Sequence, residues 1–153
     1  MKKWIVLCAL ALSGCTQITS YDQAVKTPAP ADLQGVWQTV TPQSGLISEQ
    51  AVASLIITPQ GDTLDCRQWQ RVIAKPGKLT VRSGDYVNVN RALRVMPLER
   101  KGTTLLYDKL EMQKMNHPTA ECQQALDELP NQPTATTLQN IEPALMKVKK
   151  TTP

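Results

Sequence analysis

The chain is 153 residues long, with 41% hydrophobic and 20% charged residues and a formal net charge of +4 at pH 7. This length suits one domain with a substantial hydrophobic core. A charge excess this small does not indicate a nucleic-acid partner, and an aromatic content of 4% without phenylalanine offers few side chains for base stacking. We therefore expect one globular domain and no nucleic-acid binding.

Residues 1–14 have the pattern of a signal peptide. Lys2 and Lys3 precede an apolar run that ends at Leu12, well short of the roughly 20 residues that span a bilayer. The following segment, Leu-Ser-Gly-Cys at 12–15, is similar to the lipobox of bacterial lipoproteins, which implies acylation of Cys15. The alternative is an ordinary secreted protein whose cleavage site falls near a cysteine by chance.

Acylation at Cys15 determines the expected location. Three acyl chains hold a protein far more firmly than one chain does. The next residue is Thr16 and not aspartate, which by the enterobacterial sorting rule implies the outer membrane. We expect a globular domain that is anchored there by its N-terminal acyl chains and faces the periplasm.

Two cysteines, Cys66 and Cys122, remain after removal of Cys8 and lipidation of Cys15. Two thiols in an oxidising compartment usually pair. The chain-entropy model gives a loop of this length a stabilisation of roughly 4 kcal/mol. The alternative is a redox pair, which usually has Cys-x-x-Cys spacing. A structural disulfide is the favoured interpretation.

The mature chain begins with a polar, proline-containing stretch at 15–32, which predicts a lipid-anchored tether. A β-rich globular domain is expected over 33–129. Its first strand is predicted in 33–40, and strands at 53–58 and 63–69 flank a turn at 59–62.

Two further turns are predicted in the middle of the chain. Lys-Pro-Gly-Lys at 75–78 suits a type II turn, because proline presets its second position and glycine its third. Strands follow at 78–84 and 85–91, the latter with an alternating pattern. Lys101-Gly102 predicts a hairpin between 93–100 and a second arm at 103–115.

A helical period replaces the β pattern at 117–129. Cys122, Leu126 and Leu129 recur on one apolar face, and Thr119 is a candidate N-cap. The predicted bridge would hold this helix against the strand that carries Cys66. Residues 130–153 are expected to form a disordered tail; the alternative is a short amphipathic element at 141–148 that contacts anionic surfaces.

Catalytic and metal-binding patterns are weak. His117 is the only histidine, whereas a zinc site needs several nitrogen or sulfur ligands. Asp62 and Asp65 lie near a predicted turn, where aspartate is common for local reasons. We expect no metal, no cofactor and no enzymatic activity.

One span is strongly basic. Between residues 67 and 101 only Asp85 and Glu99 oppose a series of cations: Arg67, Arg71, Lys75, Lys78, Arg82, Arg91, Arg94, Arg100 and Lys101. Solvated charges on the outside of a sheet are the simple interpretation. The alternative is a patch for an acidic partner. Trp69 lies among polar and basic residues, which suits an amphipathic contact surface. We predict an interaction surface formed by Trp69, Arg67, Arg71, Lys75 and Lys78.

Three blocks carry a family resemblance: VKTPAPADLQGVWQT at 25–39, GDTLDCRQWQRVIAKPGKLT at 61–80 and HPTAEC at 117–122. They are similar to the YedD-like family of enterobacterial lipoproteins, over roughly residues 24–129. The resemblance implies a lipid-anchored envelope protein with a bridge between Cys66 and Cys122. It implies no particular activity.

Gly35-Val36-Trp37 resembles the Gly-x-Trp that opens lipocalin-like barrels, where the tryptophan packs at the closed end. We therefore predict an α+β, mainly antiparallel fold: a small lipocalin-like barrel or curled sheet with a C-terminal helix. The expected function is a noncatalytic periplasmic interaction module with an unknown envelope protein as partner. The alternative is a small-barrel carrier of an apolar ligand or lipid.

Overall fold

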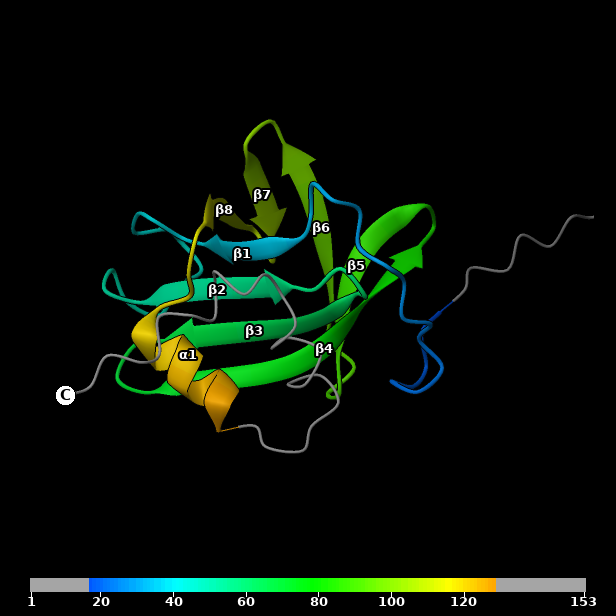
Figure 1. The fold of residues 1–153 in the computed structure, drawn as a ribbon, viewed down its shortest axis with the longest axis horizontal. Coiled ribbons are helices and arrows are strands. Elements are labelled where there is room, and N and C mark those ends of the chain that lie inside the picture. The colour runs from blue at the N-terminus through cyan, green and yellow to red at the C-terminus, as the bar shows by residue number, and fades with distance from the viewer. Residues whose placement is uncertain (1–16, 129–153) are drawn as a thin grey trace, which may run out of the picture.

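The computed structural model describes residues 17–128, and they form a closed barrel of eight antiparallel strands with one short helix (Figure 1). The predictions for the signal peptide, Cys15 and the tail at 130–153 lie outside the described residues. The elements in chain order are β1 (Gly35–Gln38), β2 (Val52–Ile57), β3 (Asp62–Gln68), β4 (Val72–Arg82), β5 (Asp85–Asn90), β6 (Val95–Lys101), β7 (Thr104–Tyr107), β8 (Leu110–Met115) and α1 (Ala120–Asp127).

Each strand pairs with the next one in the chain, and β8 pairs with β1 to close the barrel. Alternate side chains point inward, as strand geometry requires. A buried cluster of large apolar residues fills the interior, including Trp37, Leu55, Leu79, Leu105 and Met112. The predicted mainly antiparallel barrel with a C-terminal helix is confirmed.

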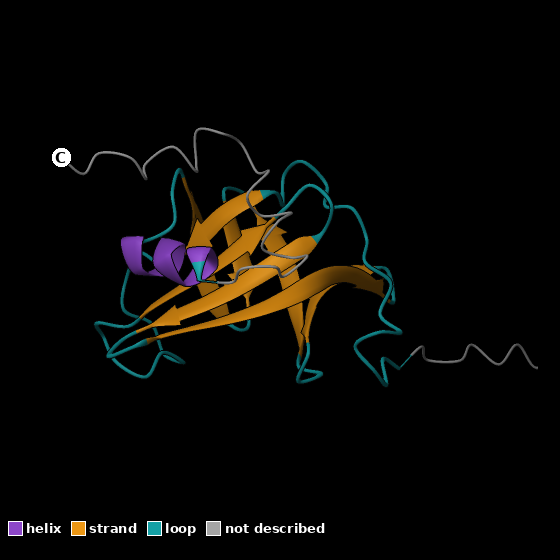
Figure 2. Ribbon diagram, turned by 60° about the horizontal axis from the view of Figure 1, so that its bottom comes forward, coloured by secondary structure: helices purple, strands orange, loops and turns teal. Residues whose placement is uncertain are grey.

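The helix covers the outside of β3 and β4 (Figure 2). The Thr119 hydroxyl accepts a hydrogen bond from the Cys122 amide at 3.1 Å, which confirms the predicted N-cap. Cys122 and Leu126 point inward, and they pack on Leu64 and Cys66 in a second apolar cluster outside the barrel. The sheet is therefore buried on both faces here.

Trp37 closes one end of the barrel. Its side chain is fully buried, and its indole N–H donates to the Leu33 carbonyl at 2.9 Å. The Arg100 guanidinium lies 4.9 Å from the ring centroid, a cation–π distance. Gly35 has a φ of +116°, a conformation that favours glycine. Both residues lie at the barrel end where the lipocalin resemblance places them.

Part of the predicted tether is packed against the barrel. The Thr27 amide donates to the Leu79 carbonyl at 2.8 Å, and the Ala29 amide donates to the Pro59 carbonyl at 3.0 Å. Ala24 is buried against Val87 and Val89 on the outside of β5. We call residues 21–33 the strap, because they bind the outer surface and the closed end. Only the residues before the strap are left to act as a spacer from Cys15.

Strand β4 runs without interruption through the segment where a turn was predicted. Pro76 and Gly77 pair with Leu64 and Thr63 of β3 in a continuous register. The prediction of a type II turn at 75–78 was therefore wrong. Gly77 is required here by close packing: a Cβ atom would lie 2.7 Å from the Val89 carbonyl oxygen and 2.8 Å from the Thr63 hydroxyl oxygen.

Candidate functional site: the open end of the barrel

The end opposite Trp37 is open. Four connections meet there: residues 39–51, 69–71, 91–94 and 108–109. Exposed large hydrophobic side chains concentrate on these connections and on the adjacent start of β4: Val40, Ile47, Trp69, Ile73 and Leu93. Ile47 is 76% exposed and Trp69 is 42% exposed. Clustered apolar exposure of this kind is typical of a binding surface.

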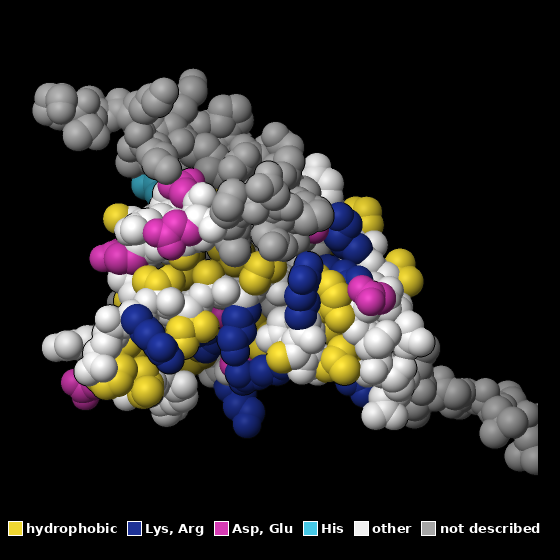
Figure 3. Space-filling view, turned by 90° about the horizontal axis from the view of Figure 1, so that it is seen from below, with side chains coloured by type: hydrophobic (Ala, Val, Ile, Leu, Met, Phe, Trp, Pro, Cys, Tyr) yellow, Lys and Arg dark blue, Asp and Glu magenta, His cyan; other side chains and the backbone are white. Residues whose placement is uncertain are grey.

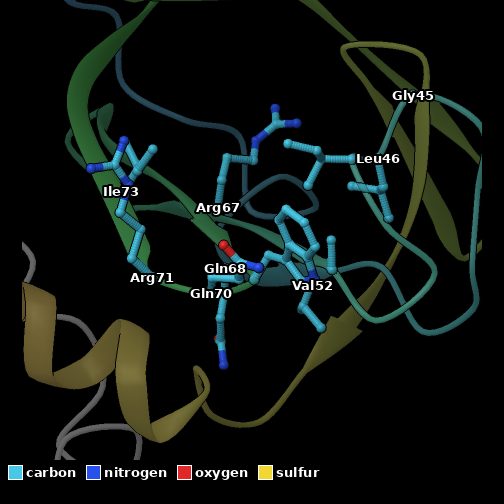
Figure 4. Close-up of a pocket in the computed structure, with 11 residues that line it drawn as sticks. Gly45, Leu46, Val52, Arg67, Gln68, Gln70, Arg71 and Ile73 are labelled. Atoms are coloured by element: carbon cyan, nitrogen blue, oxygen red, sulfur yellow. The ribbon is translucent and has the colours of Figure 1, made fainter.

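A cavity of about 610 Å³ opens between the 39–51 connection and the β3–β4 turn (Figure 4). Its apolar wall comes from Leu46, Ile47, Ala51, Val52, Trp69 and Ile73. Arg67, Gln68, Gln70 and Arg71 add polar groups. Gln43 holds the 39–51 connection in place, since its side chain donates to the Glu111 carbonyl at 2.6 Å and accepts from the Glu111 amide at 2.7 Å.

Arg67 lies at the inner end of this cavity and is held by two carboxylates. Its Nε donates to Asp65 Oδ1 at 2.7 Å, and its Nη2 donates to Asp108 Oδ2 at 3.2 Å. Arg94 donates to both oxygens of Asp108, at 2.7 and 2.8 Å. Burial lowers the pKa of Arg67, but the two carboxylates raise it by more, so the pKa lies above its ordinary value. Arg67 is therefore a fixed positive charge.

Below Arg67, a chain of polar side chains crosses the barrel interior. The Tyr107 hydroxyl donates to Asp65 Oδ2 at 2.7 Å and accepts from Asn88 Nδ2 at 2.9 Å. The Thr63 hydroxyl donates to Asn88 Oδ1 at 2.5 Å. Burial raises the pKa of Tyr107 strongly, and the charge of Asp65 raises it further. The hydroxyl therefore stays protonated and works as a hydrogen-bond donor. The buried polar groups of this network are therefore paired with one another.

A second, smaller cavity of about 120 Å³ opens at the side of the barrel, between β4 and the β5–β6 turn. It is lined by Asp65, Arg67, Ile73, Lys75, Asn90, Arg94 and Met96. On the face below β4, Lys and Arg side chains gather in the middle, with hydrophobic side chains on either side (Figure 3). The two cavities share Arg67 and Ile73 as lining residues, so they lie next to each other.

The predicted interaction surface is only partly brought together. Arg67, Trp69 and Arg71 line the larger cavity, and Lys75 lines the smaller one. Lys78 lies on the other face of β4, where its ammonium group is 4.2 Å from the ring centroid of Tyr21 in the strap. Residues whose numbers differ by an odd amount lie on opposite faces of a strand. The spacing of Lys75 and Lys78 could therefore have shown this once both were known to share a strand.

Sequence reasoning missed several residues of the open end. Leu46 and Ile47 come from an irregular connection that carries no periodic signal. Asp108 and Arg94 meet Arg67 from distant parts of the chain. The available signal was the alternation of Thr63, Asp65 and Arg67 in β3, where every second residue is polar and points inward.

The two cysteines lie together between β3 and α1. Cys66 and Cys122 are buried thiols in the same apolar cluster. The pKa of Cys122 lies well above its ordinary value, chiefly because of a hydrogen bond with Cys66 and secondly because of burial. A raised pKa disfavours the reactive thiolate. Their proximity is compatible with the predicted disulfide, which stays a prediction.

The residues considered for catalysis or metal binding, His117, Asp62 and Asp65, do not form one site. His117 is exposed just before α1. Asp62 pairs with Lys26 of the strap at 3.2 Å, whereas Asp65 pairs with Arg67 inside the barrel. Within residues 17–128 no group of three or more His, Cys, Asp or Glu side chains is arranged to hold a metal ion. None of the helices in this part of the chain is both long and apolar enough to cross a bilayer.

The eight-stranded antiparallel barrel, the tryptophan at its closed end and the helix on its outside define a small lipocalin-like protein. The comparisons give the family. The chain matches, over residues 18–126, the family described as "Bacterial lipocalin LPS transport optimiser YedD", and it belongs to that family.

Relatives support the assignment. The chain is 52% identical to the uncharacterized lipoprotein YedD of Escherichia coli K12 and 51% identical to that of Salmonella typhimurium LT2. Each match covers 85% of this chain, with 96% and 93% of the two relatives. A crystal structure of lipoprotein YedD from Klebsiella pneumoniae matches with a TM-score of 0.69 at 50% identity, over 71% of this chain and 93% of that one. Because the relatives are lipoproteins, this chain is a membrane-anchored envelope protein. The family and these relatives carry no enzymatic name.

Proposed function

We propose that this protein is a noncatalytic accessory of lipopolysaccharide transport that binds a partner protein of the envelope through the open end of its barrel. The family description names lipopolysaccharide transport. The observation that carries the proposal is the exposed Trp69 beside an apolar cavity flanked by Arg67 and Arg71. Tryptophan and arginine are enriched where protein interfaces concentrate their binding energy.

Photocrosslinking in cells tests this proposal. A photoreactive amino acid replaces Trp69 or Arg71 in one set of strains and Val81 in a control strain. Val81 is the matched position, because it is also an exposed apolar residue but lies at the far end of β4. We expect one discrete protein adduct from positions 69 and 71, whose mass-spectrometric identity is a component of lipopolysaccharide transport. An adduct from Val81 alone, or no adduct from folded and lipidated protein, would refute the proposal.

The proposed location is the outer membrane, with the barrel in the periplasm and the acyl chains on Cys15. The proposal rests on Thr16, which follows Cys15, the predicted acylation site. Density-gradient fractionation tests it. We expect the natural chain in the outer-membrane fraction and Thr16→Asp in the inner-membrane fraction. Equal distribution of the two proteins would contradict the sorting argument.

A second candidate function is a carrier of an apolar or amphipathic ligand, and the 610 Å³ cavity favours it. The barrel interior around Trp37 is filled by side chains. A ligand would instead occupy the open end. Mass spectrometry of lipids that co-purify with the protein distinguishes the candidates: a stoichiometric lipid, lost in Ile73→Glu and retained in Val81→Glu, would favour the carrier over the interaction module.

A further inference from the structure

Strand β4 has an edge without a partner strand, although the barrel is closed elsewhere. It pairs with β3 over its first seven residues, from Val72 to Lys78. Its pairing with β5 begins only at Gly77, opposite Asn90. The β5 chain then turns away, with the Leu93 amide donating to the Asn90 carbonyl at 3.0 Å. Residues 72–76 therefore have a neighbouring strand on one side only.

The register shows which backbone groups point to this free edge. The Leu79 amide donates to the Gly61 carbonyl on the β3 side. Backbone direction alternates along an antiparallel strand, so residues of even number in β4 point to the β5 side. At the edge, Val72 and Ala74 thus offer N–H and C=O groups, and Pro76 offers a carbonyl. The part of the chain that the structure describes shows no backbone hydrogen bond to these groups.

Pro76 fits this arrangement. Proline has no N–H, so it is tolerated in a sheet where its nitrogen faces away from a partner. Here the nitrogen faces the free edge, and the pairing of β3 with β4 loses no hydrogen bond. The sequence of the strand is thus compatible with an unpaired edge. This edge still presents two backbone N–H donors and three carbonyl acceptors.

The side chains beside the edge give the chemistry of a partner. Inward-pointing Ile73 and Lys75 face Arg94 and Met96 across the smaller cavity, and Arg67 lies beneath them. Lys75 is exposed and makes no ion pair with residues 17–128. Two copies joined through this edge would bring like charges together, which opposes self-association. An added strand with acidic side chains on its inward face would meet the cations instead.

We propose that the β4 edge at residues 72–76 binds an extended acidic segment of a partner protein by β-strand addition, in continuation of β5. This inference rests on the proposed function, and it adds the mode of binding. Backbone hydrogen bonds would supply affinity, while Ile73, Lys75 and Arg94 would select a segment of alternating apolar and acidic residues.

A peptide-binding experiment tests the mode directly. The probe is a ten-residue peptide of alternating valine and glutamate, and the control is its valine–lysine counterpart. Each is titrated into the mature lipoprotein in neutral detergent micelles, with calorimetry for affinity and amide hydrogen exchange for the site. We expect the glutamate peptide alone to bind and to slow exchange at Val72 and Ala74.

Two variants make the result specific. Ala74→Pro removes one edge donor and breaks no existing hydrogen bond of the sheet, so binding should weaken by about tenfold or more. Lys75→Glu should lose the glutamate peptide and gain the lysine peptide, a gain that misfolding cannot produce. Arg82→Glu, an exposed charge at the far end of the same strand, is the matched control and should bind as the natural chain does.

Two results would overturn the inference. They are no binding of the glutamate peptide and binding without protection of Ala74. Its failure is separable from failure of the proposed function, because the crosslink from Trp69 in cells does not depend on strand addition. If that adduct persists in Ala74→Pro, the interaction module stands and the binding mode is wrong.

Discussion

Replacement of Tyr107 by phenylalanine should destabilise the barrel without changing its shape. The ring is fully buried, so phenylalanine keeps its packing. The lost hydroxyl donates to a carboxylate oxygen of Asp65 at 2.7 Å and accepts from the Asn88 amide at 2.9 Å. A hydrogen bond to a charged group contributes roughly 1.5–3 kcal/mol and a neutral one about 1 kcal/mol. We expect the free energy of unfolding of Tyr107→Phe to fall by about 3 kcal/mol.

The effect has a defined pH dependence. Burial and Asp65 raise the pKa of Tyr107 above its ordinary value of 10.0. The folded state therefore keeps this proton at a pH where the unfolded chain releases it. The stability from Tyr107 is fully present below pH 10 and falls above it, by about 1.4 kcal/mol per pH unit. The stability gap between the natural chain and Tyr107→Phe should therefore narrow above pH 10.

Urea unfolding followed by tryptophan fluorescence measures both quantities, at pH 7 and between pH 10 and 11. Tyr86→Phe is the matched control, because Tyr86 is half-buried and its hydroxyl makes no hydrogen bond within residues 17–128. We expect almost no loss for it. A gap below about 1 kcal/mol at pH 7 for Tyr107→Phe, or a gap that does not narrow at alkaline pH, would refute the cross-barrel role of this hydroxyl.

Three further changes test the packing of the barrel. Gly77→Ala would place a Cβ 2.7 Å from the Val89 carbonyl oxygen, so thermal unfolding should show a loss of about 1–3 kcal/mol; an unchanged Tm would contradict this contact. If Cys66 and Cys122 form a disulfide in periplasmic protein, a reductant should lower the free energy of unfolding by up to roughly 4 kcal/mol. Titration of two free thiols in that protein would disprove the disulfide. Gly61→Ala should displace the strap, because its Cβ would lie 2.0 Å from the Thr27 carbonyl oxygen, and limited proteolysis should then cut within residues 21–33; unchanged resistance would argue against the strap contact.

Local patterns predicted the elements that local forces determine. The Thr119 cap and the inward face of α1 follow from side-chain spacing alone, and both were found. A hairpin joins β6 to β7 as expected, but its two-residue turn is Gly102-Thr103, one residue later than predicted, because Lys101 still pairs with Thr104; Gly102 has a φ of +59°. The barrel was predictable because short alternating strands with one Gly-x-Trp allow few closed arrangements.

Two errors have the same physical origin. Proline and glycine at 76 and 77 have strong turn chemistry, but they stay extended because they pair with Leu64 and Thr63 of β3. Conversely, the predicted arm at 103–115 contains a turn at Asp108 and Lys109, whose φ values are +50° and +64°. Nothing in those two residues except a mild tolerance of aspartate for this conformation marks the turn. In both cases pairing between strands overrode local preference.

The candidate site was predictable in its charge but not in its geometry. A basic span around Trp69 was visible in the sequence. Its residues Lys75 and Lys78 point to opposite faces of β4, which could not be foreseen while a turn was predicted between them. The carboxylates of Asp65 and Asp108 that fix Arg67 meet it through tertiary folding. Only the alternation of polar residues in β3 hinted that charges enter the barrel.

The distribution of polar groups differs between the two ends of this barrel. Trp37 and the strap close the opposite end, and apolar side chains fill the middle. The hydrogen bonds that join Thr63, Asn88, Tyr107 and Asp65 satisfy the polar groups inside the barrel. Near the smaller cavity, three cations face two carboxylates: Arg67, Arg94 and Lys75 against Asp65 and Asp108. The excess positive charge and the free backbone edge of β4 lie beside the smaller cavity, and the exposed indole of Trp69 lines the larger one. The proposed acidic, partly apolar partner would contact all three.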